Sequence, residues 1–82
     1  MLLCDRPEVE FAHFIGTDDD IVVLLNHSGS ALNATLTFPR EVVDASDARG
    51  GAPVPVASTA FGVPLGRFGA AALRVTYRSD AG

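Results

Sequence analysis

The sequence predicts an all-β chain that folds as a small antiparallel β-sandwich of six or seven strands with Greek-key-like connections. Apolar and polar residues alternate over residues 32–38 and 71–78, which is the period of two that strands with one buried face show. The run over residues 21–25 is apolar throughout and too short to favour a helix. We therefore expect a central strand there, buried on both faces.

The remaining strands are expected from the same patterns and from the turns between them. Residues 9–15 form the first strand, and a glycine-containing acidic loop at 16–20 joins it to the next as a hairpin. Pro39 ends the strand at 32–38, because proline donates no ladder hydrogen bond. Short outer strands are expected at 42–45, 54–58 and 61–65, with Pro55 and Pro64 favouring sheet edges. A turn at 66–69, in which Gly69 permits the tight bend, precedes the last strand.

The length of 82 residues allows a single domain, and we expect the sandwich to occupy residues 8–77 between loose ends. A folded chain of this size hides only roughly 60% of the surface of its unfolded form, so a few core side chains carry its stability. Six residues are expected to fill the space between the sheets. They are Leu24, Leu36, Phe38, Leu65, Leu73 and Val75.

Composition argues against several classes of function. Ten acidic residues against six arginines give a net charge of −4, which is unsuited to the phosphate backbone of a nucleic acid. No apolar run approaches the ~20 residues of a membrane-spanning helix, and the start of the chain lacks the features of a signal peptide. The compartment stays open, with the cytoplasm favoured. The single cysteine, Cys4, permits no internal disulfide and no cysteine-based zinc site.

The sequence offers no convincing set of catalytic residues. Hydrolysis of a glycoside requires two carboxyl groups held across a cleft, whereas Glu8, Glu10 and Glu41 are expected at solvated edges. The acidic run at 18–20 lacks the ligand spacing of a calcium loop and fits a solvated hairpin turn better. Two histidines are too few for a catalytic zinc site, and no nucleophile elbow or phosphate-binding loop is present. We therefore expect neither catalytic residues nor a metal or cofactor.

Sugar binding is expected to be weak or absent. Sugar-binding surfaces stack a sugar ring on an exposed Trp or Tyr side chain, which has a large apolar body and a polar tip. This chain has no Trp and one Tyr, Tyr77. Most of its five Phe residues fall on faces that are predicted to point inward.

Three segments follow a known pattern, in order and across residues 8–77. Residues 21–28, IVVLLNHS, are similar to a signature in which a strand ends in Leu-Asn-His/Phe-Ser/Thr. Residues 43–51 match a short strand and turn at Asp44 and at the glycine pair, and residues 63–73, VPLGRFGAAAL, are similar to a closing segment with an aromatic-glycine turn. Together they resemble the C-terminal β-sandwich of TIM-barrel glycoside hydrolases, most closely that of family-42 β-galactosidases and next the domain C of α-amylases. This chain has Gly66-Arg67 where that pattern has a proline pair.

The resemblance implies a non-catalytic accessory domain that packs on the catalytic barrel or on a neighbouring subunit. A freestanding carbohydrate- or protein-binding module is the alternative. We expect self-association of the isolated chain through an apolar surface on the outer sides of the edge strands, around Phe14, Val54, Val56 and Phe61. Asn26 is expected to cap the turn after its strand, and Phe68 to close the sandwich.

Overall fold

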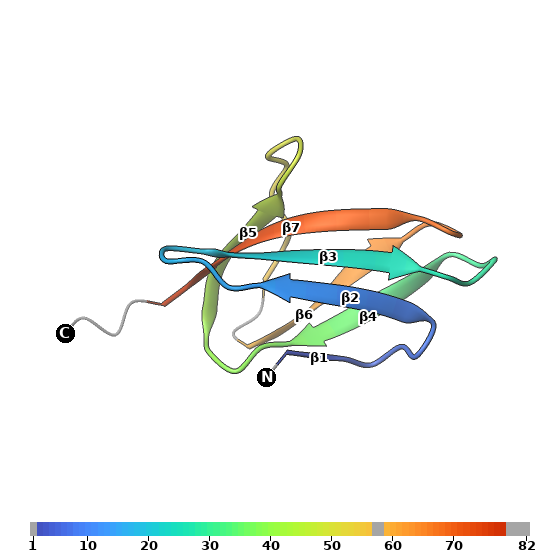
Figure 1. The fold of residues 1–82 in the computed structure, drawn as a ribbon, viewed down its shortest axis with the longest axis horizontal. Coiled ribbons are helices and arrows are strands. Elements are labelled where there is room, and N and C mark those ends of the chain that lie inside the picture. The colour runs from blue at the N-terminus through green and yellow to red at the C-terminus, as the bar shows by residue number, and fades with distance from the viewer. Residues whose placement is uncertain (1, 57–58, 79–82) are drawn as a thin grey trace.

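In residues 2–56 and 59–78, which the computed structural model describes, seven strands form two antiparallel sheets that enclose one hydrophobic core (Figure 1). The strands are β1 (Leu3–Cys4), β2 (Val9–Phe14), β3 (Asp20–Asn26), β4 (Leu32–Thr37), β5 (Val42–Asp47), β6 (Ala60–Leu65) and β7 (Ala70–Tyr77). One sheet has the order β1-β4-β6 and the other the order β2-β3-β7-β5. The predicted small all-β sandwich is confirmed.

The connections bring strands that are distant in sequence side by side. β2 and β3 form a hairpin in which Phe14 pairs with Ile21 and Val9 with Asn26. The last strand, β7, lies between β3 and β5. In the other sheet β4 pairs with β6 over six residue pairs, which include Leu36 with Phe61. Insertion of the last strand between two earlier ones is the Greek-key-like feature of the chain.

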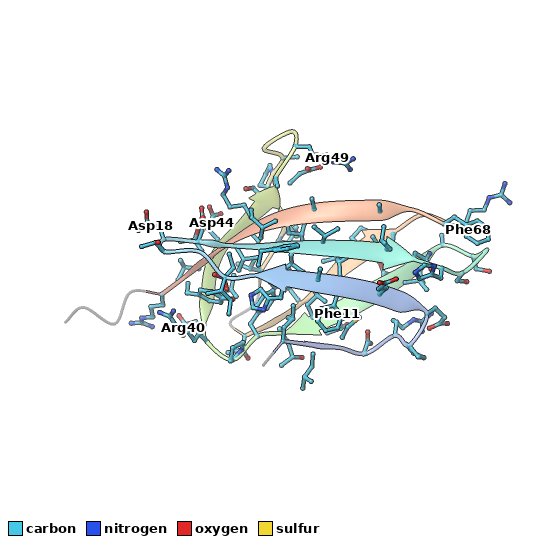
Figure 2. All side chains as sticks on the ribbon, in the orientation of Figure 1. Phe11, Asp18, Arg40, Asp44, Arg49 and Phe68 are labelled. Atoms are coloured by element: carbon cyan, nitrogen blue, oxygen red, sulfur yellow. The ribbon has the colours of Figure 1, made fainter. Side chains whose placement is uncertain are left out.

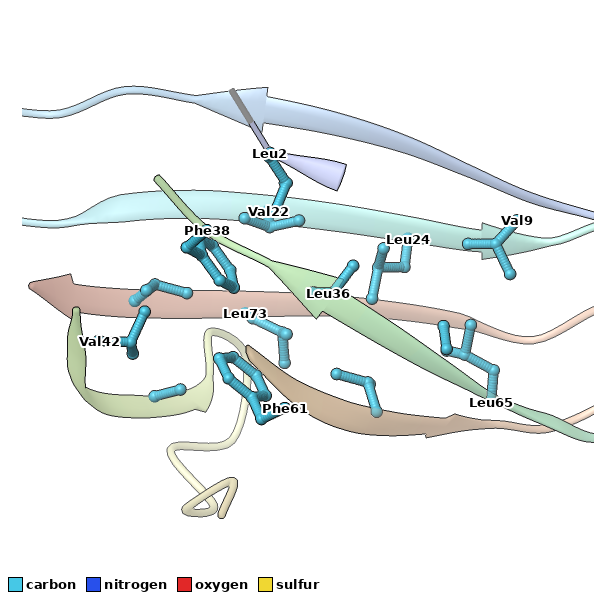
Figure 3. Close-up of a cluster of buried hydrophobic side chains, with 14 of the residues drawn as sticks. Leu2, Val9, Val22, Leu24, Leu36, Phe38, Val42, Phe61, Leu65 and Leu73 are labelled. Atoms are coloured by element: carbon cyan, nitrogen blue, oxygen red, sulfur yellow. The ribbon is translucent and has the colours of Figure 1, made fainter. Parts of the chain in front are cut away.

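The core forms where the inward-facing residues of both sheets meet, and Figure 3 shows these side chains filling the space between the ribbons. All six residues predicted for the core are buried, with Leu24, Leu36 and Val75 fully so. Phe38 stacks on Phe61 with their ring centroids 5.4 Å apart, which joins the end of β4 to β6. The sequence patterns therefore placed these six residues correctly.

The predicted exposure of Phe61 is wrong. Phe61 is 5% exposed and belongs to the core, because it lies four residues before Leu65 on β6 and so shares the inward face with it. The predicted strand at 54–58 is also wrong for its described part. Residues 54–56 form no strand, since prolines at 53 and 55 interrupt the ladder, and only Val54 N–H bonds back to Ala45 O (2.9 Å). Residues 57 and 58 lie outside the described part of the chain.

Two further expectations need correction. β3 is buried on one face only: its side chains alternate between buried positions and positions that are partly or largely exposed, with Leu25 40% exposed. The short strand β1, which pairs Leu3 with Thr37 and Cys4 with Leu36, was not predicted. Leu2, just before it, is 4% exposed and adds a side chain to the core from a segment that we expected to be loose.

Candidate functional site

The four-stranded sheet turns an apolar surface away from the core. On β3, Asp20, Val22, Leu24 and Asn26 are buried, so Ile21, Val23 and Leu25 point outward. The same alternation turns Ala12 and Phe14 of β2, and Ala70 and Ala72 of β7, to the outside. We call these seven outward residues the apolar face. Its members are Ala12, Phe14, Ile21, Val23, Leu25, Ala70 and Ala72.

The apolar face has a ridge of large side chains on β3, formed by Ile21, Val23 and Leu25, with alanines on the neighbouring strands. Val23 pairs with Ala12 on one side and with Ala72 on the other, and Leu25 has Ala70 beside it on β7. Val23 therefore stands between two methyl groups and Leu25 beside one, while Ile21 has Phe14 and Arg74 as neighbours. In Figure 2 this side of the sheet faces the viewer, and short side chains lie along the middle of the β7 ribbon.

The outer face of the other sheet differs in chemistry. The outward residues of β4 are polar, because Leu32, Ala34 and Leu36 alternate into the core. Asn33 pairs with Pro64, and Thr35 with Gly62. An extended apolar outer surface is thus a property of the four-stranded sheet.

Of the four residues predicted to form a contact surface, only Phe14 lies on the apolar face, where it is 59% exposed. Val54 and Val56 are half-buried and pack against the core cluster from the segment between β5 and β6. Phe61 lies inside the core. These four residues therefore do not form one surface, and Ile21, Val23 and Leu25 are the surface residues that sequence reasoning missed.

A polar cluster lies at the end of the sandwich where β2 and β3 are joined. The Asp20 carboxylate, which is buried, accepts hydrogen bonds at Oδ2 from Tyr77 OH (2.7 Å) and from His13 Nε2 (2.7 Å). Its Oδ1 accepts the N–H of Gly16 (3.1 Å). These bonds tie β2, β3, β7 and the hairpin loop together at one carboxylate.

The environment of Asp20 keeps it ionised. Burial acts to raise the pKa of Asp20, but the hydrogen bonds from Tyr77, His13 and Gly16 outweigh it, so the pKa of Asp20 is lowered. Burial, together with the hydrogen bond to Asp20, raises the pKa of Tyr77. A carboxylate that is ionised and already accepts three hydrogen bonds is a poor proton donor, so Asp20 does not have the properties of a general acid.

A cleft of about 520 Å³ opens beside this cluster, between the hairpin loop and the segment at Pro39 and Arg40. The Arg40 guanidinium lies over the Tyr77 ring, 4.9 Å from its centroid, and Phe38 meets the same ring edge-on. A sugar would stack on the ring of Tyr77, the one tyrosine of this protein. Other protein groups already contact that ring.

Replacing Asp20 with Asn is expected to destabilise the fold by about 1–2 kcal/mol at pH 7, because Asn offers one acceptor oxygen where the carboxylate offers two. The folded-state pKa of Asp20 lies below its ordinary value of 3.8. Its stabilising effect is therefore present above the unfolded-state pKa and is lost as the pH falls through the folded-state value. Melting temperatures of both proteins between pH 7 and pH 2 should converge at the acid end.

Asp18→Asn is the matched control, since Asp18 is an exposed member of the same loop. Its melting temperature should follow that of the wild type over the whole pH range. A constant difference between Asp20→Asn and the wild type down to pH 2 would contradict the assignment of an ionised, stabilising carboxylate at position 20.

Asn26 joins two turns at the opposite end of the sandwich. Its Nδ2 group donates to Ser30 O (3.0 Å) and to Gly66 O (2.8 Å), and its Oδ1 accepts the N–H of Ser28 (2.9 Å). The predicted capping of the following turn is confirmed. The bond to Gly66, forty residues away, was not predicted, and it fastens the β3–β4 turn to the β6–β7 turn.

The predicted closing role of Phe68 is wrong. Phe68 is 70% exposed and projects from the β6–β7 turn, as Figure 2 shows. Its backbone has a φ of 51°, and Gly69 follows at a point where a β-carbon would lie 2.9 Å from Gly66 O. The tight turn determines the direction of the side chain, so the ring is directed out of the sandwich.

The remaining candidate groups do not assemble into a catalytic or metal-binding arrangement in the described part of the chain. His27 Nε2 binds Glu10 Oε1 (2.8 Å), while Ser28 Oγ accepts the N–H of Ser30. Within residues 2–56 and 59–78, no group of three or more His, Cys, Asp or Glu side chains is placed to hold a metal ion. The same residues include no helix that is long and apolar enough to cross a membrane.

Comparison with known proteins finds no matching family model, no matching curated protein and no matching solved structure.

Proposed function

We propose that this chain is a non-catalytic accessory β-sandwich of a glycoside hydrolase, and that it works by packing against another protein surface. The observation that carries the proposal is the apolar face on the four-stranded sheet, where Phe14 and Leu25 are exposed and Val23 is half-buried between them. Covering such a surface stabilises an assembly, because apolar area is removed from water. The catalytic barrel of the parent enzyme and a neighbouring subunit are the partners that the family resemblance implies.

The local structure of the resembling segments supports the same role. The segments at 21–28 and 63–73 meet at Asn26, whose backbone N–H also donates to Gly69 O (2.8 Å). Phe68 N–H donates to Ser28 O (2.9 Å). The polar residues of these segments thus bond to backbone groups and hold turns together, which is a structural use of the motif.

The proposal predicts that the purified chain hydrolyses no glycoside and binds simple sugars weakly or not at all. The reason is that the buried carboxylate, Asp20, and the aromatic ring of Tyr77 are both engaged by other protein groups. Titration with galactose, lactose and short glucans, followed by NMR chemical shifts, should give no saturable change. Chromogenic glycosides should remain intact at high protein concentration.

Saturable sugar binding in the sub-millimolar range would overturn the accessory role and favour the freestanding binding module. Shifts centred on Phe68 would identify its exposed ring as the stacking surface. The reading frame upstream of Met1 provides an independent test, since the proposal expects it to encode a (β/α)-barrel.

A further inference from the structure

We infer that the apolar face binds the apolar face of a second copy of this chain, about a twofold axis that runs along the strands between β3 and β7. The inference rests on the proposed contact function and names the partner for it. It also replaces the contact surface that the sequence predicted around Val54, Val56 and Phe61. In the structure these three residues pack against the core or lie inside it.

The shape of the face is complementary to itself. With the axis between β3 and β7, β3 of one copy lies over β7 of the other, and the arrangement is reciprocal, as a twofold interface requires. Residues that pair across these strands then also meet across the interface: Val23 lies over Ala72 of the second copy, and Leu25 over its Ala70. Val23 and Leu25 thereby each lie over a methyl group, which permits close packing, while Ile21 lies over Arg74 of the second copy.

The dimensions of the sheet suit a weak, specific dimer. Four strands span roughly 19 Å across and seven residues roughly 24 Å along the strands. Two copies placed face to face would therefore cover on the order of 900 Å² in total, which is the size of weak, transient interfaces and less than the ~1,200 Å² of stable ones. Sheets that pack face to face lie about 10 Å apart with their strands within about 30° of alignment, which this axis allows.

The charges permit this contact. The seven residues of the apolar face are uncharged, and the two charged residues paired with them, Arg74 beside Ile21 and Glu10 beside Leu25, each have a partner within the same copy. Arg74 Nε lies 3.5 Å from Asp19 Oδ2, and His27 Nε2 lies 2.8 Å from Glu10 Oε1. Two copies of net charge −4 repel each other at long range, so dimerisation should strengthen as salt is raised to ~150 mM.

Sedimentation equilibrium of the chain tests the inference. We expect a monomer–dimer equilibrium with a Kd of roughly 10 µM to 1 mM. Val23→Asp places a charge at the centre of the face and should weaken the dimer at least ~tenfold. Asn33→Asp adds the same charge on the outer face of the other sheet and should leave the Kd unchanged. Val23→Thr keeps a β-branched side chain, so this variant should remain folded. It should weaken the dimer less than Val23→Asp.

Ala72→Leu distinguishes the inferred geometry from unspecific hydrophobic association. Filling the space that receives Val23 of the second copy should weaken the dimer, although the substitution makes the surface more apolar. A chain that stays monomeric to ~1 mM, a Val23→Asp dimer as strong as the wild type, or an Ala72→Leu dimer that is stronger would each overturn the inference. Sugar titration decides the proposed function separately, because a monomer that binds no sugar leaves the accessory role intact.

Discussion

Truncating Leu24 to Ala is expected to lower the free energy of unfolding by about 2–5 kcal/mol, and Leu73→Ala by a similar amount. Leu24 is fully buried in the middle of β3, and Leu73 is 2% exposed on β7 beside it. Each change removes apolar contacts and leaves a cavity that the two sheets cannot close without moving toward each other and disturbing the rest of the core. A domain of this size has a total stability of about 5–15 kcal/mol at most, so either variant loses a large part of it.

Leu25→Ala is the matched control. It makes the same chemical change one position along the strand, on the apolar face, where Leu25 is 40% exposed. Urea unfolding at low protein concentration, followed by circular dichroism, should show a loss below about 1 kcal/mol for Leu25→Ala. Equal losses for Leu24→Ala and Leu25→Ala would contradict the assignment of one buried and one open face to β3.

The core was the most predictable part of this protein, and its physical basis is simple. Along a strand the side chains alternate between two faces, so Leu36 and Phe38, or Leu73 and Val75, fall on the same side whatever their partners are. The prediction that Phe61 is exposed did not follow this rule. Phe61 lies four residues before Leu65 on β6, so the two side chains point to the same face.

β3 shows why burial is harder to predict than strand formation. An apolar outward residue such as Val23 loses contact with water favourably when it is buried. The sequence does not say whether this chain or another one buries it. In the sandwich the second sheet covers only the face that carries Leu24. The prediction of two buried faces was therefore wrong for the single chain.

The polar cluster could not be predicted because its members are distant in sequence. Asp20 was expected to be one of three solvated loop aspartates, but it pairs with Tyr77, fifty-seven residues away. That contact exists only because β7 inserts beside β3, and hydrophobic periodicity does not determine strand order. Asn26 was intermediate: the local bond to Ser28 follows from the sequence, while the bond to Gly66 depends on the fold.

Asn26→Ala is expected to lower the free energy of unfolding by about 2–4 kcal/mol, a large effect for a single polar side chain. Asn26 is 3% exposed, and its side chain makes three hydrogen bonds to backbone groups. Removing it leaves Gly66 O, Ser30 O and Ser28 N without these partners, and water reaches so enclosed a side-chain position poorly. The loss should also loosen the β6–β7 turn, so amide hydrogen exchange at Phe68 and Gly69 should accelerate more than exchange within the β4–β6 ladder.

Asn33→Ala provides the control, since Asn33 is exposed on the outer face of β4 and should change stability by less than about 0.5 kcal/mol. Asn26→Asp separates the two halves of the amide. It keeps an oxygen for the Ser28 N–H but turns a second oxygen toward Gly66 O and Ser30 O, where two acceptors meet. We therefore expect Asn26→Asp to be at least as unstable as Asn26→Ala at neutral pH. If Asn26→Ala had the same free energy of unfolding as the wild type, and its Phe68 N–H exchanged at the wild-type rate, the two turns would be held by their backbone hydrogen bonds alone.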